Sequence, residues 1–268
     1  MIVSNQSHQI EVWGDFACFS RPELSVERFS YPCPTPGATR GIFEAIYFKP
    51  QFRWQVEQIE LLNPPSYLGL RRNEVKDKAS EAAVKKWMAG TDEPEPLFAD
   101  ADKSQTGSDF KGRTQRQTMA LRNPRFRLTA RIVPRPGFER EQKAYDEQFR
   151  RRASQGKCFV QPCLGMKEFV AFFEYLSDTT NLAPPVDYSQ DLGYMVYDVF
   201  DLADDNYYQR DGETRALKLD KKSQEPVRRD WKSVGPSIAV FQATIDHGVL
   251  LVPPFESDLV LKPERRAG

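Results

Sequence analysis

Apolar and polar residues alternate along several segments in the first half of the chain, and a helical pattern separates the first two of them. The segment 9–19 has apolar residues on one side and predicts an opening strand that is interrupted by Gly14. A helix is predicted over 35–50, because Thr35 is a typical N-cap residue and Pro36 suits the first helical position. The segment 52–56 is apolar at every second position and predicts the next strand. This order of elements begins a β-α-β arrangement.

The clearest strand pattern is RFRLTARIV, which covers residues 125–133. Its apolar residues all fall on one side, and its arginines all fall on the other. The apolar side consists of Phe126, Leu128, Ala130 and Ile132, and the polar side consists of Arg125, Arg127, Thr129 and Arg131. We expect one face of this strand to enter the core and the other face to form a basic stripe.

A second helix is predicted over 139–153, where apolar residues recur at helical spacing. Tyr145, Phe149 and Ala153 share one side of this helix. Arginines fill the last turn, where a cation interacts favourably with the helix dipole. These arginines are Arg150, Arg151 and Arg152.

Turn signals in the rest of the chain indicate how it is divided. The segment 91–113 is polar and acidic and predicts a loop, 183–185 (APP) marks a break, and 246–248 predicts the turn of a closing hairpin. Strands that are mainly antiparallel, with few helices, indicate the α+β class. We expect a ferredoxin-like or RRM-like domain over 1–185 and a smaller, antiparallel β-rich domain over 186–268.

Charge is unevenly distributed along the chain, although its 38 basic and 38 acidic residues leave no net charge. The segment 111–157 contains 14 basic and 4 acidic residues, whereas the rest contains 24 basic and 34 acidic residues. A cationic segment of this kind suits the phosphates of a nucleic acid. The alternative is a solvated surface that binds no partner.

Several classes of protein are not indicated by this sequence. No apolar stretch approaches the roughly 18 to 20 residues of a membrane span. The polar N-terminal segment has no signal-peptide pattern, so we expect a cytoplasmic protein. There is no P-loop, HExxH or GxSxG motif, which argues against the familiar classes of hydrolase.

Two groups of residues resemble metal ligands, and both have a simpler interpretation. Cys158 and Cys163 have no second thiol pair to complete a zinc site, so we interpret the four cysteines as reduced thiols. An acidic run has the ligand type that divalent cations prefer, but a solvated acidic edge is the commoner arrangement. This run consists of Asp198, Asp201, Asp204 and Asp205. We therefore expect neither a metal nor a cofactor.

Four collinear blocks of the sequence resemble one protein family. They are VWGDFACFSRPELSVERFSYPCPTPGATRGIFEAIYFKPQFRW, LRRNEVK, FRRRASQGKCFVQPCLG and DLGYMVYD. Together they resemble the CRISPR-associated Cas5 family of subtype I-C, the Dvulg type. The resemblance implies a ferredoxin-like N-terminal domain and a metal-independent endoribonuclease that cleaves the CRISPR repeat transcript at the base of its hairpin. It also implies that the protein keeps the 5′ handle of the guide RNA as a subunit of the interference complex.

The first catalytic element implied by the resemblance is a tyrosine. Cleavage without a metal uses the RNA 2′-hydroxyl as the nucleophile and needs groups that move protons and stabilise charge. The family's Tyr in its IYxKP segment matches Tyr47, and Lys49 lies close by. A Tyr has a pKa near 10, so Tyr47 needs a cationic neighbour to act as a base and less help to act as an acid. The alternative is an ordinary aromatic residue that closes a helix.

The second catalytic element implied by the resemblance departs from the family pattern. The family has an adjacent Lys and His, or Lys and Tyr, shortly before FxRR. In QKAYDEQFRRR the Lys position is occupied by Ala144 and the next position by Tyr145, with Lys143 one residue early. On a regular helix Lys143 and Tyr145 are about 200° apart, so both face the RNA only if Lys143 precedes the helix. Tyr145 is equally consistent with a core residue.

Two functions fit these residues. The first is an endoribonuclease with Tyr47, Lys143 and Tyr145 as catalytic residues, and the second is a non-catalytic subunit that holds the guide RNA. The predicted RNA contacts are Lys49, Arg125, Arg127, Arg131, Arg150, Arg151 and Arg152. We expect the repeat RNA and the other subunits of the complex as partners, weak binding of duplex DNA, and no association with a membrane.

Overall fold

The computed structural model combines helices with two largely antiparallel sheets, which confirms the predicted α+β class. It describes residues 6–24, 26–76, 80–94, 100–107, 112–177, 182–199, 202 and 238–262. The larger sheet has eight strands and the smaller one has four. No helix in the described part of the chain is long and apolar enough to cross a membrane.

The larger sheet has the strand order β12-β10-β11-β4-β7-β1-β8, and β9 pairs with β10. Its strands are β1 (Ser7–Trp13), β4 (Phe52–Leu61), β7 (Arg125–Pro134), β8 (Phe172–Tyr175), β9 (Gln190–Asp198), β10 (Ala239–Asp246), β11 (Val249–Leu251) and β12 (Val260–Leu261). The strands predicted over 52–56 and 125–133 are confirmed as β4 and β7. The interruption predicted at Gly14 within 9–19 is confirmed, because β1 ends at Trp13. The two parts do not form one strand, since β1 stays in this sheet while β2 (Phe16–Ala17) joins the smaller one.

The first long helix, α1 (Pro36–Ile46), begins as predicted and ends earlier than predicted. Thr35 Oγ1 accepts a hydrogen bond from the Ala38 amide at 3.1 Å, as expected of an N-cap residue. The helix ends before Tyr47, which has an extended backbone. The last carbonyls of α1 accept hydrogen bonds from the Arg152 side chain and from the Phe159 and Val160 amides, in place of the amides of a further helical turn.

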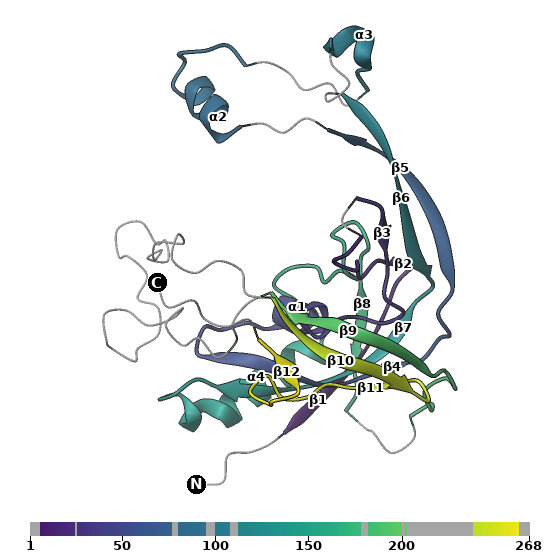
Figure 1. Ribbon diagram of the computed structural model, residues 1–268. Coiled ribbons are helices and arrows are strands. Elements are labelled where there is room, and N and C mark those ends of the chain that lie inside the picture. Colours follow the sequence, from purple (N-terminus) through teal and green to yellow (C-terminus); the bar gives the residue numbers. More distant parts are fainter. Residues whose placement is uncertain are drawn as a thin grey trace.

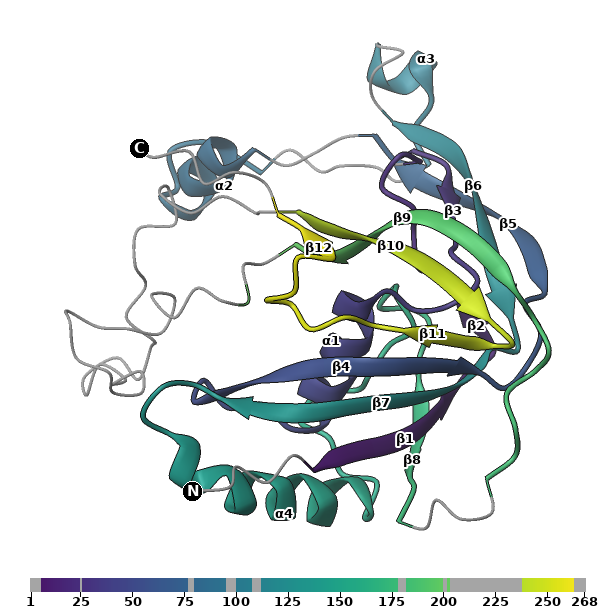
Figure 2. The same ribbon diagram turned by 60° about the horizontal axis from the view of Figure 1, so that its bottom comes forward.

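The second long helix, α4 (Gln142–Ala153), follows a short 3-10 helix, η1 (Glu139–Glu141), so the helix predicted over 139–153 is confirmed. Both long helices contribute to the layer that covers one face of the larger sheet (Figure 2). The Trp54 ring of β4 contacts Phe43 of α1 and Phe149 of α4, with ring centroids 4.8 and 4.7 Å apart. These aromatic contacts fix the two helices against each other and against the sheet.

The smaller sheet extends away from the rest of the molecule. It contains β2, β3 (Arg28–Phe29), β5 (Tyr67–Val75) and β6 (Arg113–Arg122). Figure 1 shows β5 and β6 as a long ribbon, with α2 (Glu81–Met88) and α3 (Lys103–Thr106) beyond its far end. The loop predicted over 91–113 is therefore wrong in part, because a capping box at Asp102 stabilises α3 inside it.

The last strands continue the larger sheet. The hairpin predicted at 246–248 is confirmed, with His247 and Gly248 at φ of 44° and 77°. A Cβ on Gly248 would lie 2.2 Å from the Val186 carbonyl oxygen, so the turn requires glycine. Because β11 pairs with β4, strands on both sides of residue 185 share one sheet. The division into domains 1–185 and 186–268 stays a prediction.

The four cysteines are free thiols, as predicted. Cys18 and Cys33 are buried, whereas Cys158 and Cys163 are partly exposed. Burial raises the pKa of the Cys33 thiol far above its ordinary value, so this thiol stays protonated in the core. Cys18 and Cys33 thus fill space in the core.

Candidate functional site

Tyr47 stands immediately after α1, with its backbone held on both sides. Its amide donates to the Phe43 carbonyl at 2.9 Å, and its own carbonyl accepts a hydrogen bond from Trp54 Nε1 at 3.0 Å. The residue is only 2% exposed. These contacts give the Tyr47 side chain a fixed origin at the junction of α1 and β4.

Tyr47 and Tyr145 come together around one aromatic ring. The Phe52 ring has its centroid 5.3 Å from that of Tyr47 and 5.1 Å from that of Tyr145. Lys49 Nζ lies 5.5 Å from the centroid of the Tyr145 ring. The structure therefore brings together three of the predicted site residues, from the end of α1 and from α4.

The hydroxyl group of Tyr47 is buried and has no hydrogen-bond partner among the described residues. Burying a hydroxyl without a partner costs about 1–3 kcal/mol, so such groups are rare in native cores. A bound ligand that accepted a hydrogen bond would remove this cost. Because the hydroxyl is covered, neighbouring side chains must move before any ligand can reach it.

The two phenols near α1 are protonated at neutral pH. Burial raises the pKa of Tyr47 to about 12, the nearby Tyr145 adds to the increase, and Arg152 opposes it. Burial also raises the pKa of Tyr145, with a further contribution from Glu141. Arg152 is the cationic neighbour that a basic Tyr47 would need, but burial outweighs it. Both phenols are thus suited to donate a hydrogen bond or a proton.

Lys143 does not join this group. The helix α4 begins one residue before it, so Lys143 is helical, and its side chain is 86% exposed. Its Nζ lies 3.9 Å from a carboxylate oxygen of Glu147, one turn further along the same helix. Tyr145 instead points into the core, where it is 5% exposed. Lys143 therefore does not precede the helix, and it lies on a different side of it from Tyr145.

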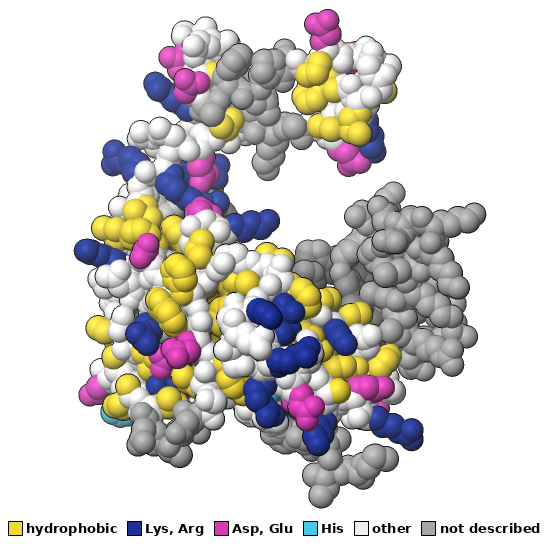
Figure 3. All heavy atoms as spheres, turned by 180° about the vertical axis from the view of Figure 1, so that it is seen from behind, with side chains coloured by type: hydrophobic (Ala, Val, Ile, Leu, Met, Phe, Trp, Pro, Cys, Tyr) yellow, Lys and Arg dark blue, Asp and Glu magenta, His cyan; other side chains and the backbone are white. Residues whose placement is uncertain are grey.

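The arginines in the last turn of α4 form the cationic end of the site. Arg152 Nε donates to the Ile46 carbonyl at 2.9 Å and so binds one of the last carbonyls of α1. Arg150 and Arg151 are exposed and donate to neutral side chains, those of Gln6 and Gln148. Across the described ranges, none of the three forms an ion pair with a carboxylate. Arg150 and Arg151 thus present their charges to solvent. Figure 3 shows Lys and Arg side chains at several places on the rear face, including its lower half.

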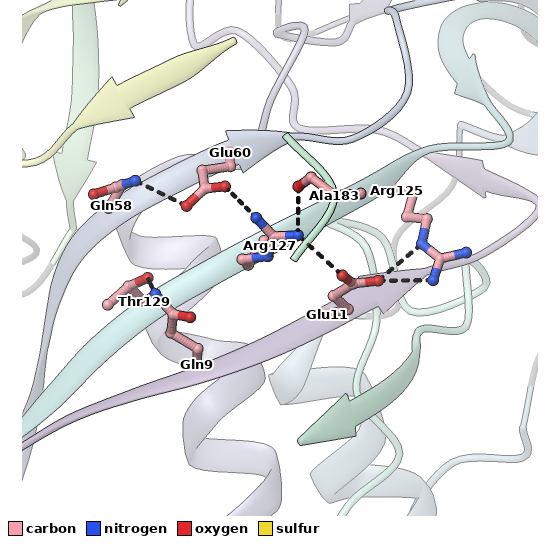
Figure 4. A network of polar contacts seen from close by, with 8 residues as sticks. All are labelled: Gln9, Glu11, Gln58, Glu60, Arg125, Arg127, Thr129 and Ala183. Atoms are coloured by element: carbon pink, nitrogen blue, oxygen red, sulfur yellow. Dashed lines mark hydrogen bonds and ion pairs between the residues drawn. The ribbon is translucent and has the colours of Figure 1, made fainter. Parts of the chain in front are cut away.

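The arginines of β7 have a different environment. Arg127 is 3% exposed and lies between two glutamates of the neighbouring strands, Glu60 and Glu11 (Figure 4). Its guanidinium nitrogens lie 2.7 Å from Glu60 and 3.3 Å from Glu11, and one of them also donates to the Ala183 carbonyl at 2.9 Å. The positive charge of Arg127 is therefore matched inside the protein and covered by the segment that contains Ala183.

The two other arginines of β7 are also paired. Arg125 makes two hydrogen bonds to Glu11, at 3.0 and 2.7 Å, and Arg131 lies 3.1 Å from Glu57. The expected basic stripe is thus a row of ion pairs across β1, β4 and β7. On β6, Arg116 similarly lies 3.2 Å from a carboxylate of the neighbouring strand, β5. The excess charge of the segment 111–157 does not form one continuous cationic surface.

The expected solvated acidic edge is wrong at Asp198. This residue is 3% exposed, and its carboxylate accepts a 2.7 Å hydrogen bond from Arg40 Nε of α1. Asp201, Asp204 and Asp205 lie outside the described residues. Among the residues that the structure does describe, no group of three or more His, Cys, Asp and Glu side chains is placed to hold a metal ion.

Sequence analysis missed an aromatic residue beside this site. The amides of Phe159 and Val160 both donate to the Ala45 carbonyl, at 2.8 and 3.3 Å, which anchors their segment to the end of α1. The Phe159 ring lies under Arg152, with the guanidinium carbon 3.9 Å from the ring centroid. The signal available in the sequence was an aromatic and a Val between Lys157 and Gln161, outside any strand pattern.

Comparison with known proteins identifies relatives of this chain. A family model described as CRISPR-associated protein, Cas5, in its Cas5d form matches residues 9–230. The chain is 34% identical over 197 residues to a CRISPR pre-crRNA endoribonuclease Cas5d of Mannheimia succiniciproducens, which covers 71% of this chain and 84% of that protein. It is 36% identical over 191 residues to a protein of the same name from Thermus thermophilus, which covers 71% of this chain and 72% of the relative.

The fold is also similar to a solved structure. A crystal structure described as a CRISPR-associated protein superimposes with a TM-score of 0.56 and 15% identity, covering 96% of this chain and 97% of the other. At this identity the likeness concerns the fold alone. The family model, by contrast, matches most of the chain and agrees with both sequence relatives. The chain belongs to the CRISPR-associated Cas5 family, subtype I-C, also called Cas5d.

Proposed function

We propose that this chain is an endoribonuclease that cleaves pre-crRNA at the base of the repeat hairpin, without a metal, and then stays bound to the 5′ handle. The observation that carries this proposal is the buried hydroxyl of Tyr47, which has no partner among the described residues and lies beside Tyr145 and Arg152. Two relatives named pre-crRNA endoribonuclease support the same substrate.

The reaction follows from the protonation states around Tyr47. The 2′-hydroxyl of the RNA attacks the adjacent phosphorus, and its proton passes to solvent. Because the pKa of Tyr47 is about 12, its phenol keeps its proton and donates it, or a hydrogen bond, at the reacting phosphate. Lys49 and Arg152 supply positive charge for the phosphorane. The bond between phosphorus and the 5′ oxygen breaks, and the leaving 5′ oxygen takes the Tyr47 proton, which solvent then replaces, or takes a proton from solvent where Tyr47 donates only a hydrogen bond. The products are a 2′,3′-cyclic phosphate and a 5′-hydroxyl.

The ferredoxin-like domain belongs to this proposal. The four strands β4-β7-β1-β8 are adjacent in this order, α1 connects β1 to β4, and α4 connects β7 to β8. This is the order and connection pattern of a split β-α-β-β-α-β unit. We infer that this unit is the RNA-processing domain, that the β5–β6 ribbon is an insertion within it, and that the chain works beside other subunits of the type I-C complex.

The second candidate function is a non-catalytic subunit that holds the guide RNA. One observation favours it: Lys143 lies on the solvent side of α4, away from Tyr145. In that case the cationic end of α4 would bind RNA while another nuclease matured the guide. Weak binding of duplex DNA is expected under both functions, because the same arginines would contact its phosphates.

The test compares Tyr47→Phe with a matched control, Tyr31→Phe. Tyr31 is also a buried tyrosine whose hydroxyl has no partner among the described residues, so the two changes remove the same group from similar surroundings. Each variant is mixed with the cognate repeat hairpin in a chelator, and single-turnover cleavage is measured. We expect Tyr47→Phe to slow cleavage by about two to four orders of magnitude, with RNA affinity unchanged and no loss of thermal stability, and Tyr31→Phe to cleave normally.

Other outcomes decide between the two functions. A wild-type protein that shifts the RNA without cutting it supports the non-catalytic subunit. Cleavage that stops in chelator contradicts the metal-free mechanism. A single 2′-deoxy substitution at the cut site should block the reaction, since it removes the nucleophile. Lys143→Ala should cost less than Tyr47→Phe, because the Lys143 side chain lies outside the cluster.

A further inference from the structure

A shallow groove opens on the surface beside the last turns of α1, the helix that Tyr47 follows. It has a volume of about 540 Å³, and its lining consists of Gly41, Glu44, Ala45, Phe48, Phe159 and Val160. Three apolar side chains at this place are exposed to solvent: Phe48 at 41%, Phe159 at 60% and Val160 at 68%. Apolar side chains that are gathered and exposed next to a candidate site indicate a surface that receives a partner.

The groove is preformed. The amides of Phe159 and Val160 both bind the Ala45 carbonyl, so the segment that carries them is fixed to the last turn of α1. Arg152 Nε binds the next carbonyl, that of Ile46, while its guanidinium group stacks on the Phe159 ring. One face of this ring is therefore covered by a cation, and the exposed remainder presents an aromatic surface that does not have to be ordered on binding.

We propose that this groove holds an unpaired nucleobase of the bound RNA, stacked on Phe159, next to the bond that is cut. This inference rests on the proposed function and deepens it. A planar base suits an exposed aromatic ring backed by arginine, because base stacking needs a π face and an arginine adds a cation–π contribution. The position is supported by Arg152, which lies over the Phe159 ring and is also the cation that opposes the effect of burial on the pKa of the Tyr47 phenol.

The charges around the groove favour a base inside it and phosphates at its rim. Glu44 is part of the lining and is paired with Arg40 at 2.5 Å, so the groove itself presents apolar atoms and a neutralised carboxylate to a ligand. Arg152 stands at the edge, and Lys49 and Lys157 are exposed nearby in sequence. Across the described residues, these three cations form no ion pair with a carboxylate. A nucleotide would thus place its base on apolar atoms and its phosphate on free positive charge.

The experiment measures the RNA affinity of Phe159→Ala, Phe159→Tyr and a control, Tyr194→Ala. Tyr194 is an aromatic residue on β9 with 64% exposure, outside the groove. The probes are the cognate repeat hairpin and an unstructured RNA of adenosines, titrated at several salt concentrations. We expect Phe159→Ala to weaken binding about 5- to 150-fold, which corresponds to the removal of one stacked base. Phe159→Tyr should restore it, and Tyr194→Ala should leave it unchanged.

Two further readouts separate stacking from electrostatic binding. The salt dependence of binding should keep its slope in Phe159→Ala, because every cation that meets a phosphate remains in place. A 2-aminopurine placed in turn at each unpaired position beside the cut should lose fluorescence at one position on binding, and regain it in Phe159→Ala. Unchanged affinity together with unquenched 2-aminopurine would overturn the inference and leave the groove to a protein partner.

The failure of this inference differs from the failure of the proposed function. If the wild-type chain binds the repeat without cutting it, and binding still depends on Phe159, the nucleobase site stands and the catalytic proposal falls. If the wild-type chain cuts, and Phe159→Ala binds and cuts normally, catalysis stands and the nucleobase site falls.

Discussion

Two groups of arginines come from the same basic stretch of sequence and differ in what faces them. On β7, Arg127 lies between Glu11 and Glu60 and is buried under the segment that contains Ala183 (Figure 4). At the end of α4, Arg150 and Arg151 are exposed and donate to neutral amide side chains. The first group is part of the sheet, whereas the second is available to a partner.

This difference shows that an excess of charge in the sequence does not locate a binding surface. The carboxylates that neutralise Arg127 are 67 and 116 residues away in the chain, and only strand pairing brings them next to β7. A central strand has a neighbour on each side, so an arginine on it meets two other strands. The end of a helix at the surface meets solvent.

The largest effect is expected at Arg127. Removing one partner from a buried ion pair leaves an uncompensated charge, so Arg127→Ala should lower the free energy of unfolding by about 3–5 kcal/mol. Glu11 and Glu60 would both remain buried without it. Arg127→Glu would bring three carboxylates together, so this charge-reversal variant should not fold. Urea unfolding measures the first change, with Arg151→Ala as a control that should stay within about 0.5 kcal/mol.

The next effect concerns RNA binding by the end of α4. Replacing Arg150 and Arg151 with Ala should weaken binding of the repeat RNA and flatten its dependence on salt by about 0.7 in log-log slope for each phosphate that is no longer neutralised. Stability should hardly change, because both side chains are exposed. Titrations at several salt concentrations provide the measurement. An unchanged slope would show that the RNA lies elsewhere, and would remove the contrast between the two groups.

Local signals in the sequence predicted the elements but not their partners. Thr35 predicted the start of α1 because an N-cap acts within one turn. The early end of α1 was not predictable, since its last carbonyls are bound by Arg152 and by the amides of Phe159 and Val160, which lie more than 100 residues away. In the candidate site, the resemblance to the family identified Tyr47 and its neighbours. No pattern in the sequence indicated the groove at the end of α1.

A smaller effect is expected when the pH is raised. The pKa of Tyr47 is about 12 in the folded chain and near 10 in an unfolded one, so the unfolded chain loses this proton first. Stability that is present below pH 10 is therefore lost as the pH rises toward 12, by about 1 kcal/mol from this residue at pH 11. Unfolding at pH 8 and pH 11 should show a smaller decrease in Tyr47→Phe than in the wild type. Equal decreases would mean that the phenol is not buried in solution, so that the junction of α1 and β4 is more open than the sheet around Arg127.

The smallest effect is expected at Arg125, which lies between the two cases. Its side chain is 46% exposed, yet it makes two hydrogen bonds to Glu11 and lies over the Trp13 ring at 5.3 Å. Exposed ion pairs contribute little, and Glu11 keeps Arg127 as a partner, so Arg125→Ala should lower the free energy of unfolding by at most about 1 kcal/mol. Because Glu11 already matches its charge, the same variant should leave the salt dependence of RNA binding unchanged. If the slope instead flattens by about 0.7, the change expected for one fewer neutralised phosphate, a paired arginine on the sheet can still bind RNA. Burial, and not pairing, would then be what separates β7 from the end of α4.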